Sequence, residues 1–285
     1  MTAPDRVGPT VVDVQGIPVA YEVRGEGRPI LLIHGWSADR RYMIADLEPI
    51  LAAEPGWRRV YLDLPGHGST PAPDWLATQD QMLSVLGDFI DAVLPGGPFA
   101  VAGNSYGGFL TLALIRSLPG RLCGAALLVP DVPAADGTRD LPRPITIHED
   151  LSVFGDLASD EQWIPAALPV HERRMVEEIR AFDMPAYRLA DYPFLERLNA
   201  NYLPSGVAGR PGAPFDRPCL IVAGRQDSTV GYRGAAGLIE ELPRATFAVL
   251  DLGGHHLGRI ERPALFEALV RDWLDRMERG SQAAF

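Results

Sequence analysis

The chain has 285 residues, of which 47% are hydrophobic and 22% are charged. These proportions are ordinary for a globular protein and exclude a disordered or fibrous chain, while the length favours one large α/β domain or one domain with an insertion. The net charge is −11, so we expect no nucleic acid and no anionic membrane as partners, because both would repel the chain. Every basic residue is Arg, which excludes a Schiff-base Lys, a P-loop Lys and a Ser–Lys dyad.

Short apolar runs alternate with helical periodicity along most of the chain. The run 29–35 is continuously apolar and ends in Gly, which is typical of a buried parallel strand. Helical spacing is clear over 75–94, where Trp75, Met82 and Leu86 fall on one side. In chain order, the pattern predicts a hairpin over 10–25, strands over 29–35, 58–66, 99–105, 122–131, 218–227 and 245–254, and helices over about 40–53, 75–94, 106–118, 232–242 and 263–279. This alternation predicts a mostly parallel sheet covered by helices on both faces.

The segment 132–205 breaks the alternation. It has no convincing strand, it shows helical patterns over 170–182 and 191–203, and joints rich in Pro and Gly flank it. We interpret it as a helical cap inserted into a core domain made of 1–131 and 206–285. Seven cap aromatics are expected to seal it partly against the core, with one or two lining a substrate pocket: Phe154, Trp163, Phe182, Tyr187, Tyr192, Phe194 and Tyr202.

The cysteines and the N-terminus indicate a reduced, soluble, cytoplasmic protein. Cys123 and Cys219 lie in apolar runs, and we expect both to be buried as small hydrophobic side chains. There is no Cys/His cluster with zinc-ligand spacing, so no metal site is expected. The first ten residues lack the apolar core of a signal peptide. No run approaches the roughly 18–20 apolar residues of a membrane span.

The strongest chemical motif is G-N-S-Y-G at residues 103–107. It has the form G-x-S-x-G and stands between a predicted strand and a predicted helix, the setting of a nucleophile elbow. In such an elbow the serine sits at a strained turn that exposes its Oγ above the sheet. The flanking glycines are needed because side chains there would collide with the neighbouring strand and helix. The motif therefore predicts that Ser105 is a nucleophile.

A serine nucleophile needs a base, and the base needs an orienting acid. In chains with this elbow the acid follows the serine and the histidine comes last. Asp227 directly follows a buried strand, which places its carboxylate at the same sheet edge as Ser105, and we favour it as the acid. Asp131 also ends a strand and is the rival. Asp251 is disfavoured because it is too close in sequence to the candidate histidines to orient one from another loop.

The base is expected in the loop after the last strand, where His255 and His256 are adjacent. His255 directly follows Gly253 and Gly254, and this flexible step lets the chain aim the next side chain back over the sheet. We therefore favour His255, with His256 as the alternative.

An oxyanion hole needs two backbone N–H groups aimed at the oxygen that becomes negative. One candidate donor is Tyr106, the residue after the nucleophile. The other is Trp36, in the loop after the strand 29–35, where Gly35 permits a tight turn. For the His34 side chain we favour a structural hydrogen bond.

Five segments together resemble the motif series of the α/β-hydrolase fold, in the same order and at ordinary spacing: LLIHGW, DLPGHGST, GNSYGG, GRQDSTV and GGHHLGRIERP. The resemblance runs from about residue 29 to 263. It implies a mostly parallel eight-stranded sheet, a helical cap inserted after the sixth strand, and a Ser–His–Asp enzyme. Carried over motif by motif, it implies Ser105 as nucleophile, Asp227 as acid and the histidine of the GGH motif as base. It also implies Trp36 and Tyr106 as the oxyanion hole.

Two details of the resemblance bear on the site. The nucleophile is Ser and not Asp, which disfavours haloalkane dehalogenase and epoxide hydrolase chemistry. Counting back from Glu261, the commonest spacing of the family lands on His256, while the approach from the strand, D-x-G-G-H, lands on His255. We give more weight to the approach, because strand and turn fix where the side chain points.

The resulting hypothesis is a cofactor-independent serine hydrolase, a carboxylesterase-like enzyme that cleaves a small or medium carboxylic ester or lactone through an acyl-enzyme. The alternatives are a carbon–carbon bond hydrolase or a perhydrolase on the same framework. A third alternative, from a different class, is a receptor-type protein that binds a small molecule and turns it over slowly or not at all.

Overall fold

The computed structural model describes residues 9–206 and 208–282. The ends of the predicted core domain (1–8 and 283–285) and residue 207 lie outside the described residues. Most of the first ten residues, which lack the apolar core of a signal peptide, therefore also lie outside the described residues. Among the described helices, none combines the length and apolar character needed to cross a membrane.

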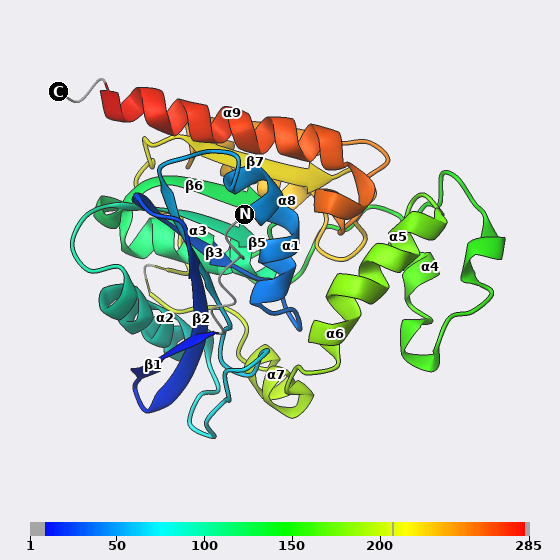
Figure 1. Ribbon diagram of the computed structural model, residues 1–285, viewed down its shortest axis with the longest axis horizontal. Helices are drawn as coiled ribbons and strands as arrows, with labels where there is room; N and C mark the ends of the chain where they lie inside the picture. The colour runs from blue at the N-terminus through cyan, green and yellow to red at the C-terminus, as the bar shows by residue number, and fades with distance from the viewer. Residues whose placement is uncertain (1–8, 207, 283–285) are drawn as a thin grey trace, which may run out of the picture.

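One sheet organises the described residues (Figure 1). Its eight strands lie in the order β1-β2-β4-β3-β5-β6-β7-β8. The hairpin β1–β2 joins β4 antiparallel, and every pairing from β4 through β3 to β8 is parallel. The predicted eight-stranded, mostly parallel sheet is therefore confirmed. The strands are β1 (Thr10–Val14), β2 (Ile17–Arg24), β3 (Arg28–Ile33), β4 (Trp57–Leu62), β5 (Phe99–Asn104), β6 (Leu122–Leu128), β7 (Cys219–Gly224) and β8 (Ala245–Leu250).

Helices cover both faces of the sheet (Figure 1). The core helices are α1 (Arg40–Leu51), α2 (Gln79–Val93), α3 (Tyr106–Ser117), α8 (Arg233–Ala236) and α9 (Pro263–Gln282). On one face α2, α3 and α8 bury apolar side chains such as Phe89 and Leu110, and on the other α1 and α9 bury Met43 and Trp273. Strands with helices on both faces must be apolar on both sides, which explains the continuous apolar run of β5 and its complete burial.

Three details differ from the sequence prediction. The helix predicted over 75–94 begins at Gln79, because Thr78 caps it, and Trp75 precedes the helix with 43% of its surface exposed. The helix predicted over 232–242 is the short α8 followed by a 3₁₀ turn over 237–239. Cys219 is buried as predicted, but Cys123 is only partly buried, because it stands near the start of β6 at the rim of the sheet.

The segment between β6 and β7 is helical, as predicted. It contains α4 (Ile164–Ala167), α5 (Arg173–Glu178), α6 (Met184–Tyr187) and α7 (Tyr192–Asn199), which Figure 1 shows grouped at one side of the sheet. The helix predicted over 170–182 is α5, which continues through a π-helical turn over 179–183 into α6. The segment has a small apolar core of its own around Ile164 and Val176. Its division from the rest as a separate domain stays a prediction.

Candidate active site

Ser105 occupies a strained turn between β5 and α3. Its φ of 53° and ψ of −113° lie outside the regions that ordinary residues favour. A side chain on Gly103 would collide with the carbonyl of Gly107, and one on Gly107 would collide with the carbonyl of Ile33 in β3. The two motif glycines are thus required by the close approach of strand, turn and helix, as the sequence indicated.

The structure brings Ser105, His255 and Asp227 together. The Nε2 atom of His255 lies 2.9 Å from Oγ of Ser105, and its Nδ1 lies 2.8 Å from Oδ2 of Asp227. The other carboxylate oxygen of Asp227 accepts hydrogen bonds from the backbone N–H groups of Thr229, at 2.8 Å, and Val230, at 3.0 Å. Because an ionised carboxylate only accepts hydrogen bonds, the proton of the neutral ring belongs on Nδ1. Nε2 then faces the serine hydroxyl as an acceptor.

Electrostatics keeps this pair in the charge states that a base and its orienting acid need. Burial opposes ionisation of Asp227, but His255 and the two backbone donors outweigh burial and lower the pKa of Asp227. Burial likewise favours neutral His255, but the adjacent Asp227 carboxylate outweighs it and raises the pKa of His255 above its usual 6.5. Asp227 is therefore ionised at neutral pH, and its charge stabilises an imidazolium on His255.

The rival residues are engaged elsewhere. Asp131 accepts two hydrogen bonds from Arg139, at 2.7 and 2.6 Å, and a third from the Tyr202 hydroxyl. Asp251 accepts a hydrogen bond from Gln226 at 2.8 Å. Neither carboxylate is hydrogen-bonded to His255, so the geometry favours Asp227 over both.

The two expected oxyanion-hole residues flank the nucleophile. Gly35 packs closely on the elbow, since a Cβ there would lie 3.2 Å from Cβ of Ser105. Trp36 lines the same pocket as Ser105, and Tyr106 is the first residue of α3. Neither backbone N–H donates a hydrogen bond to another described residue. Both donors are therefore available to a bound oxygen, and their role stays a prediction.

His34 and His67 make hydrogen bonds within the core. His34 bonds the Gly35 carbonyl at 2.8 Å through Nδ1 and accepts the Leu64 N–H at 3.0 Å through Nε2. His67 bonds the Pro65 carbonyl at 2.9 Å. Burial lowers the pKa of His34 to about 4 and that of His67 to about 3. Both rings are therefore neutral and structural.

Ser105 and His255 open into a pocket of about 280 Å³ between the sheet and the inserted segment. Three aromatic residues of the segment line it, Trp163, Tyr187 and Tyr192, where one or two were expected. Phe182 is 40% exposed and Phe194 is buried against the sheet's helices, so neither lies in the pocket wall. Aromatic rings form much of the pocket wall, and its polar side chains include Asn104 and Thr229 as well as Ser105 and the two adjacent histidines.

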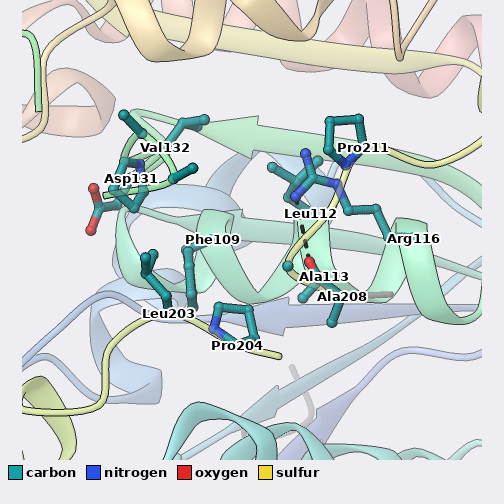
Figure 2. Close-up of a pocket in the computed structure, with 14 residues that line it drawn as sticks. Phe109, Leu112, Ala113, Arg116, Asp131, Val132, Leu203, Pro204, Ala208 and Pro211 are labelled. Carbon is teal, nitrogen blue, oxygen red and sulfur yellow. Dashed lines mark hydrogen bonds between the residues drawn. The ribbon is translucent and has the colours of Figure 1, made fainter. Parts of the chain in front are cut away.

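A larger cavity of about 460 Å³ does not contain Ser105. Figure 2 shows it between Phe109, Leu112 and Arg116 of α3 and the end of the inserted segment around Pro204. The Tyr202 ring lies between the two spaces, because it packs on Trp36 of the serine pocket and on Phe109 of the larger cavity. We place the candidate site in the smaller pocket, since the nucleophile and base open there.

Sequence reasoning missed a buried charged cluster beside this pocket. Arg259 forms ion pairs with Asp46 of α1 and with Asp183 of the π-helical turn, and His256 lies next to Asp183. No local motif marks Asp46 or Asp183, and the only signal was the second histidine of the His255–His256 pair. Within the described part of the chain, no group of three or more His, Cys, Asp and Glu side chains is arranged to hold a metal ion.

Comparison with known proteins places the fold. The model of a family described as the alpha/beta hydrolase family matches residues 30–269. The structure of an alpha/beta superfamily hydrolase from Oenococcus oeni PSU-1 is similar with a TM-score of 0.82 and 25% identity, over 91% of this chain and 96% of that one.

Two relatives of similar sequence have names that state an activity. A 2-hydroxy-6-oxo-6-(2'-aminophenyl)hexa-2,4-dienoic acid hydrolase of Metapseudomonas resinovorans is 34% identical over 142 residues, which are 49% of this chain and 45% of the relative. A pimeloyl-[acyl-carrier protein] methyl ester esterase of Neisseria meningitidis is 24% identical over 260 residues, which are 87% of this chain and 94% of the relative. The chain spans less than half the length of the relatives that it matches at 33–34% identity.

Proposed function

The chain belongs to the alpha/beta hydrolase family, and we propose that it is a serine hydrolase that cleaves a small or medium carboxylic ester or lactone through an acyl-enzyme. One observation carries the proposal. The contacts run from Asp227 through both ring nitrogens of His255 to the Ser105 hydroxyl, at 2.8 and 2.9 Å. This is the arrangement that activates a serine hydroxyl.

In the acylation half, Oγ of Ser105 attacks the carbonyl carbon while Nε2 of His255 takes its proton. The negative charge on the carbonyl oxygen is stabilised by the N–H groups of Trp36 and Tyr106. Asp227 stabilises the imidazolium and does not itself take the proton. The tetrahedral intermediate then collapses, and His255 gives its proton to the leaving alkoxide. For a lactone, the freed hydroxyl stays attached to the acyl group.

In the deacylation half, a water molecule takes the place of the alcohol. His255 removes a proton from the water, the hydroxide oxygen bonds to the acyl carbon, and the oxyanion hole holds the second intermediate. Collapse breaks the bond to Oγ, and His255 returns the proton to Ser105. The products are a carboxylic acid and the free enzyme, so no cofactor is consumed.

Pocket size and lining support a small or medium, partly apolar substrate. About 280 Å³ beside Ser105, walled by aromatic rings, suits a compact acyl or alkoxy group. The Neisseria relative is named as a methyl ester esterase, which supports ester cleavage. The Metapseudomonas relative is named as a hydrolase of a hydroxy-oxo-dienoic acid, and this name keeps carbon–carbon bond hydrolysis as the second candidate.

Labelling with a fluorophosphonate probe tests the proposal directly. We expect mass spectrometry to find the probe on Ser105, and we expect Ser105→Ala to lose the label and roughly 10⁴–10⁶ in kcat. Ser117→Ala is the matched control, because Ser117 ends the same helix and its hydroxyl donates to the Ala113 carbonyl, away from the pocket. Retention of more than a tenth of the activity by Ser105→Ala would refute the assignment. A panel of an ester, a lactone and a diketone then separates the two candidate reactions.

A further inference from the structure

A second aspartate–histidine contact borders the same pocket. His256 follows the proposed base, and its ring centroid lies 6.1 Å from that of His255 at an interplanar angle of 85°. Its Nδ1 atom lies 3.2 Å from Oδ2 of Asp183, which the π-helical turn of the inserted segment supplies. Thus each of the two adjacent histidines presents Nδ1 to its own aspartate.

The buried charge of Asp183 is already compensated without His256. It is completely buried, and its other oxygen forms an ion pair with Arg259. Arg259 is held in turn by Asp46 of α1 and by Glu178, the latter at 3.3 Å. The charge of Asp183 is therefore offset by a guanidinium that is fixed from the core, so the histidine beside it is not required as a counter-ion.

The contact decides which nitrogen of His256 is available. Because a carboxylate oxygen only accepts hydrogen bonds, a ring that carries a single proton is favoured with that proton on Nδ1, the nitrogen that faces Asp183. Nδ1 is enclosed, and its N–H is not aligned well enough for a hydrogen bond despite the 3.2 Å separation. The ring lines the Ser105 pocket, and Nε2 has no hydrogen-bonding partner among the described residues. Nε2 is thus an acceptor that remains free for a bound molecule.

Packing alone does not call for a histidine at this position. The ring stacks on Trp163 of the pocket wall, with centroids 5.7 Å apart and planes at 28°, a role that any flat ring could fill. The His256 side chain is only 5% exposed, so its contact with water is limited. A hydrogen-bond donor on a bound substrate would give Nε2 a partner that the described residues do not provide.

We propose that His256 is a specificity residue whose Nε2 accepts a hydrogen bond from a hydroxyl group on the substrate, so that the substrate class is a hydroxyl-bearing ester. The inference rests on the proposed function of the Ser105 pocket. The ring centroids of His255 and His256 are 6.1 Å apart, so one compact ester can contact both rings.

Matched esters test the proposal. The panel is ethyl butanoate, ethyl 3-hydroxybutanoate and 2-hydroxyethyl butanoate, which place a hydroxyl on neither part, on the acyl part or on the alcohol part. For the unmodified enzyme we expect kcat/KM to favour one hydroxylated ester over ethyl butanoate by about tenfold, the worth of one good hydrogen bond. In His256→Phe, which keeps a flat ring but no acceptor, this ratio should fall to about one. In His256→Gln, whose side-chain oxygen can accept, part of the preference should return.

His171→Phe is the matched control. His171 is likewise a buried histidine, but it lies in the inserted segment and packs on Phe154, with ring centroids 4.6 Å apart, outside the pocket wall. Its ratio should stay at about ten. Fluorophosphonate labelling of Ser105 in each variant verifies that the site is assembled.

Two results would overturn the proposal: no preference for either hydroxylated ester in the unmodified enzyme, or an undiminished preference in His256→Phe. Both are distinct from failure of the proposed function. If Ser105-dependent hydrolysis of ethyl butanoate is present without a hydroxyl preference, only the role of His256 is wrong. If no hydrolysis depends on Ser105, the proposed function is wrong as well.

Discussion

Glu261 allows a prediction that does not depend on the substrate. Its carboxyl group is almost completely buried, with Oε2 accepting the Gly254 N–H at 2.8 Å and Oε1 enclosed without a partner. Burial raises the pKa of Glu261 to about 7 from 4.5, although His256, His255 and the Gly254 N–H favour the ionised form; the nearby Asp227 adds to the rise. At acidic pH the buried group is therefore protonated and neutral.

The raised pKa of Glu261 makes the free energy of unfolding depend on pH. Between pH 4.5 and 7 the folded chain holds a proton on Glu261 that the unfolded chain releases, so this group lowers the stability as the pH rises through that window. Above pH 7 both states are ionised and the effect levels off. With one pKa unit worth about 1.4 kcal/mol, the loss between pH 5 and pH 8 is about 2–3 kcal/mol.

Glu261→Gln removes the charge and keeps an oxygen for the Gly254 N–H. Urea unfolding of both proteins at pH 5, 6, 7 and 8 gives the difference in unfolding free energy at each pH, in which the titration of all other groups largely cancels. We expect the variant to gain about 2–3 kcal/mol on the unmodified protein across this range. A difference that stays constant within about 0.5 kcal/mol would refute the reasoning. A change of the opposite sign would show that a protonated histidine holds Glu261 ionised.

Three further predictions concern the elbow and the proposed base. Asp227→Asn should lower kcat by a factor of about 10⁴, because the amide favours the wrong tautomer of His255. Asp131→Asn should lower kcat less than tenfold. If steady-state kinetics gave the reverse order, the acid would be Asp131. In the unmodified enzyme kcat/KM should rise with pH through an inflection above 6.5, because Asp227 raises the pKa of His255 and only the neutral ring can act as a base. A flat profile from pH 5 to 9, measured where the chemical step is rate-limiting, would contradict this. Gly107→Ala should lower the free energy of unfolding by about 2 kcal/mol or more, because the added methyl group meets the β3 backbone. Gly87→Ala in α2, where the space is open, should raise the free energy of unfolding by roughly 0.5–1 kcal/mol. Thermal melts that rank the two variants equally would contradict the predicted collision.

The sheet could be predicted because each buried strand is recognisable from the apolar run in its own short segment. The strands β3, β5 and β7 contain short apolar runs, and each is followed within three positions by a residue of the candidate site. Since the carboxyl ends of parallel strands meet at one edge, the positions of Ser105 and Asp227 followed from their own segments. The choice of His255 over His256 rested on the approach from the strand, and the observed contacts agree with it, while its role as the base stays a prediction.

Other features could not be predicted because they depend on contacts between distant segments. Asp183 and His256 are 73 positions apart in sequence and meet only after the inserted segment has folded over the sheet. The same holds for the aromatic residues of the inserted segment: both Trp163 and Phe194 were expected to pack against the core, yet Trp163 lines the pocket and Phe194 is buried in the apolar core. Trp75 was misplaced for a different reason, since the Thr78 cap decides where α2 begins and overrides the apolar spacing before it.

The Arg259 ion pairs also bear on how a molecule reaches Ser105. Arg259 joins Asp183, on the inserted segment, to Asp46, on α1, so these pairs span the boundary that a lid would have to open. Raising the segment as a rigid flap would break these ion pairs, although water would hydrate the parted charges and offset part of the lost attraction. The exposed rim of the pocket, where Tyr192 is 48% accessible, offers a route to Ser105 that leaves these ion pairs intact. If molecules enter by this route, the shape of the rim selects them, and the inserted segment does not have to move.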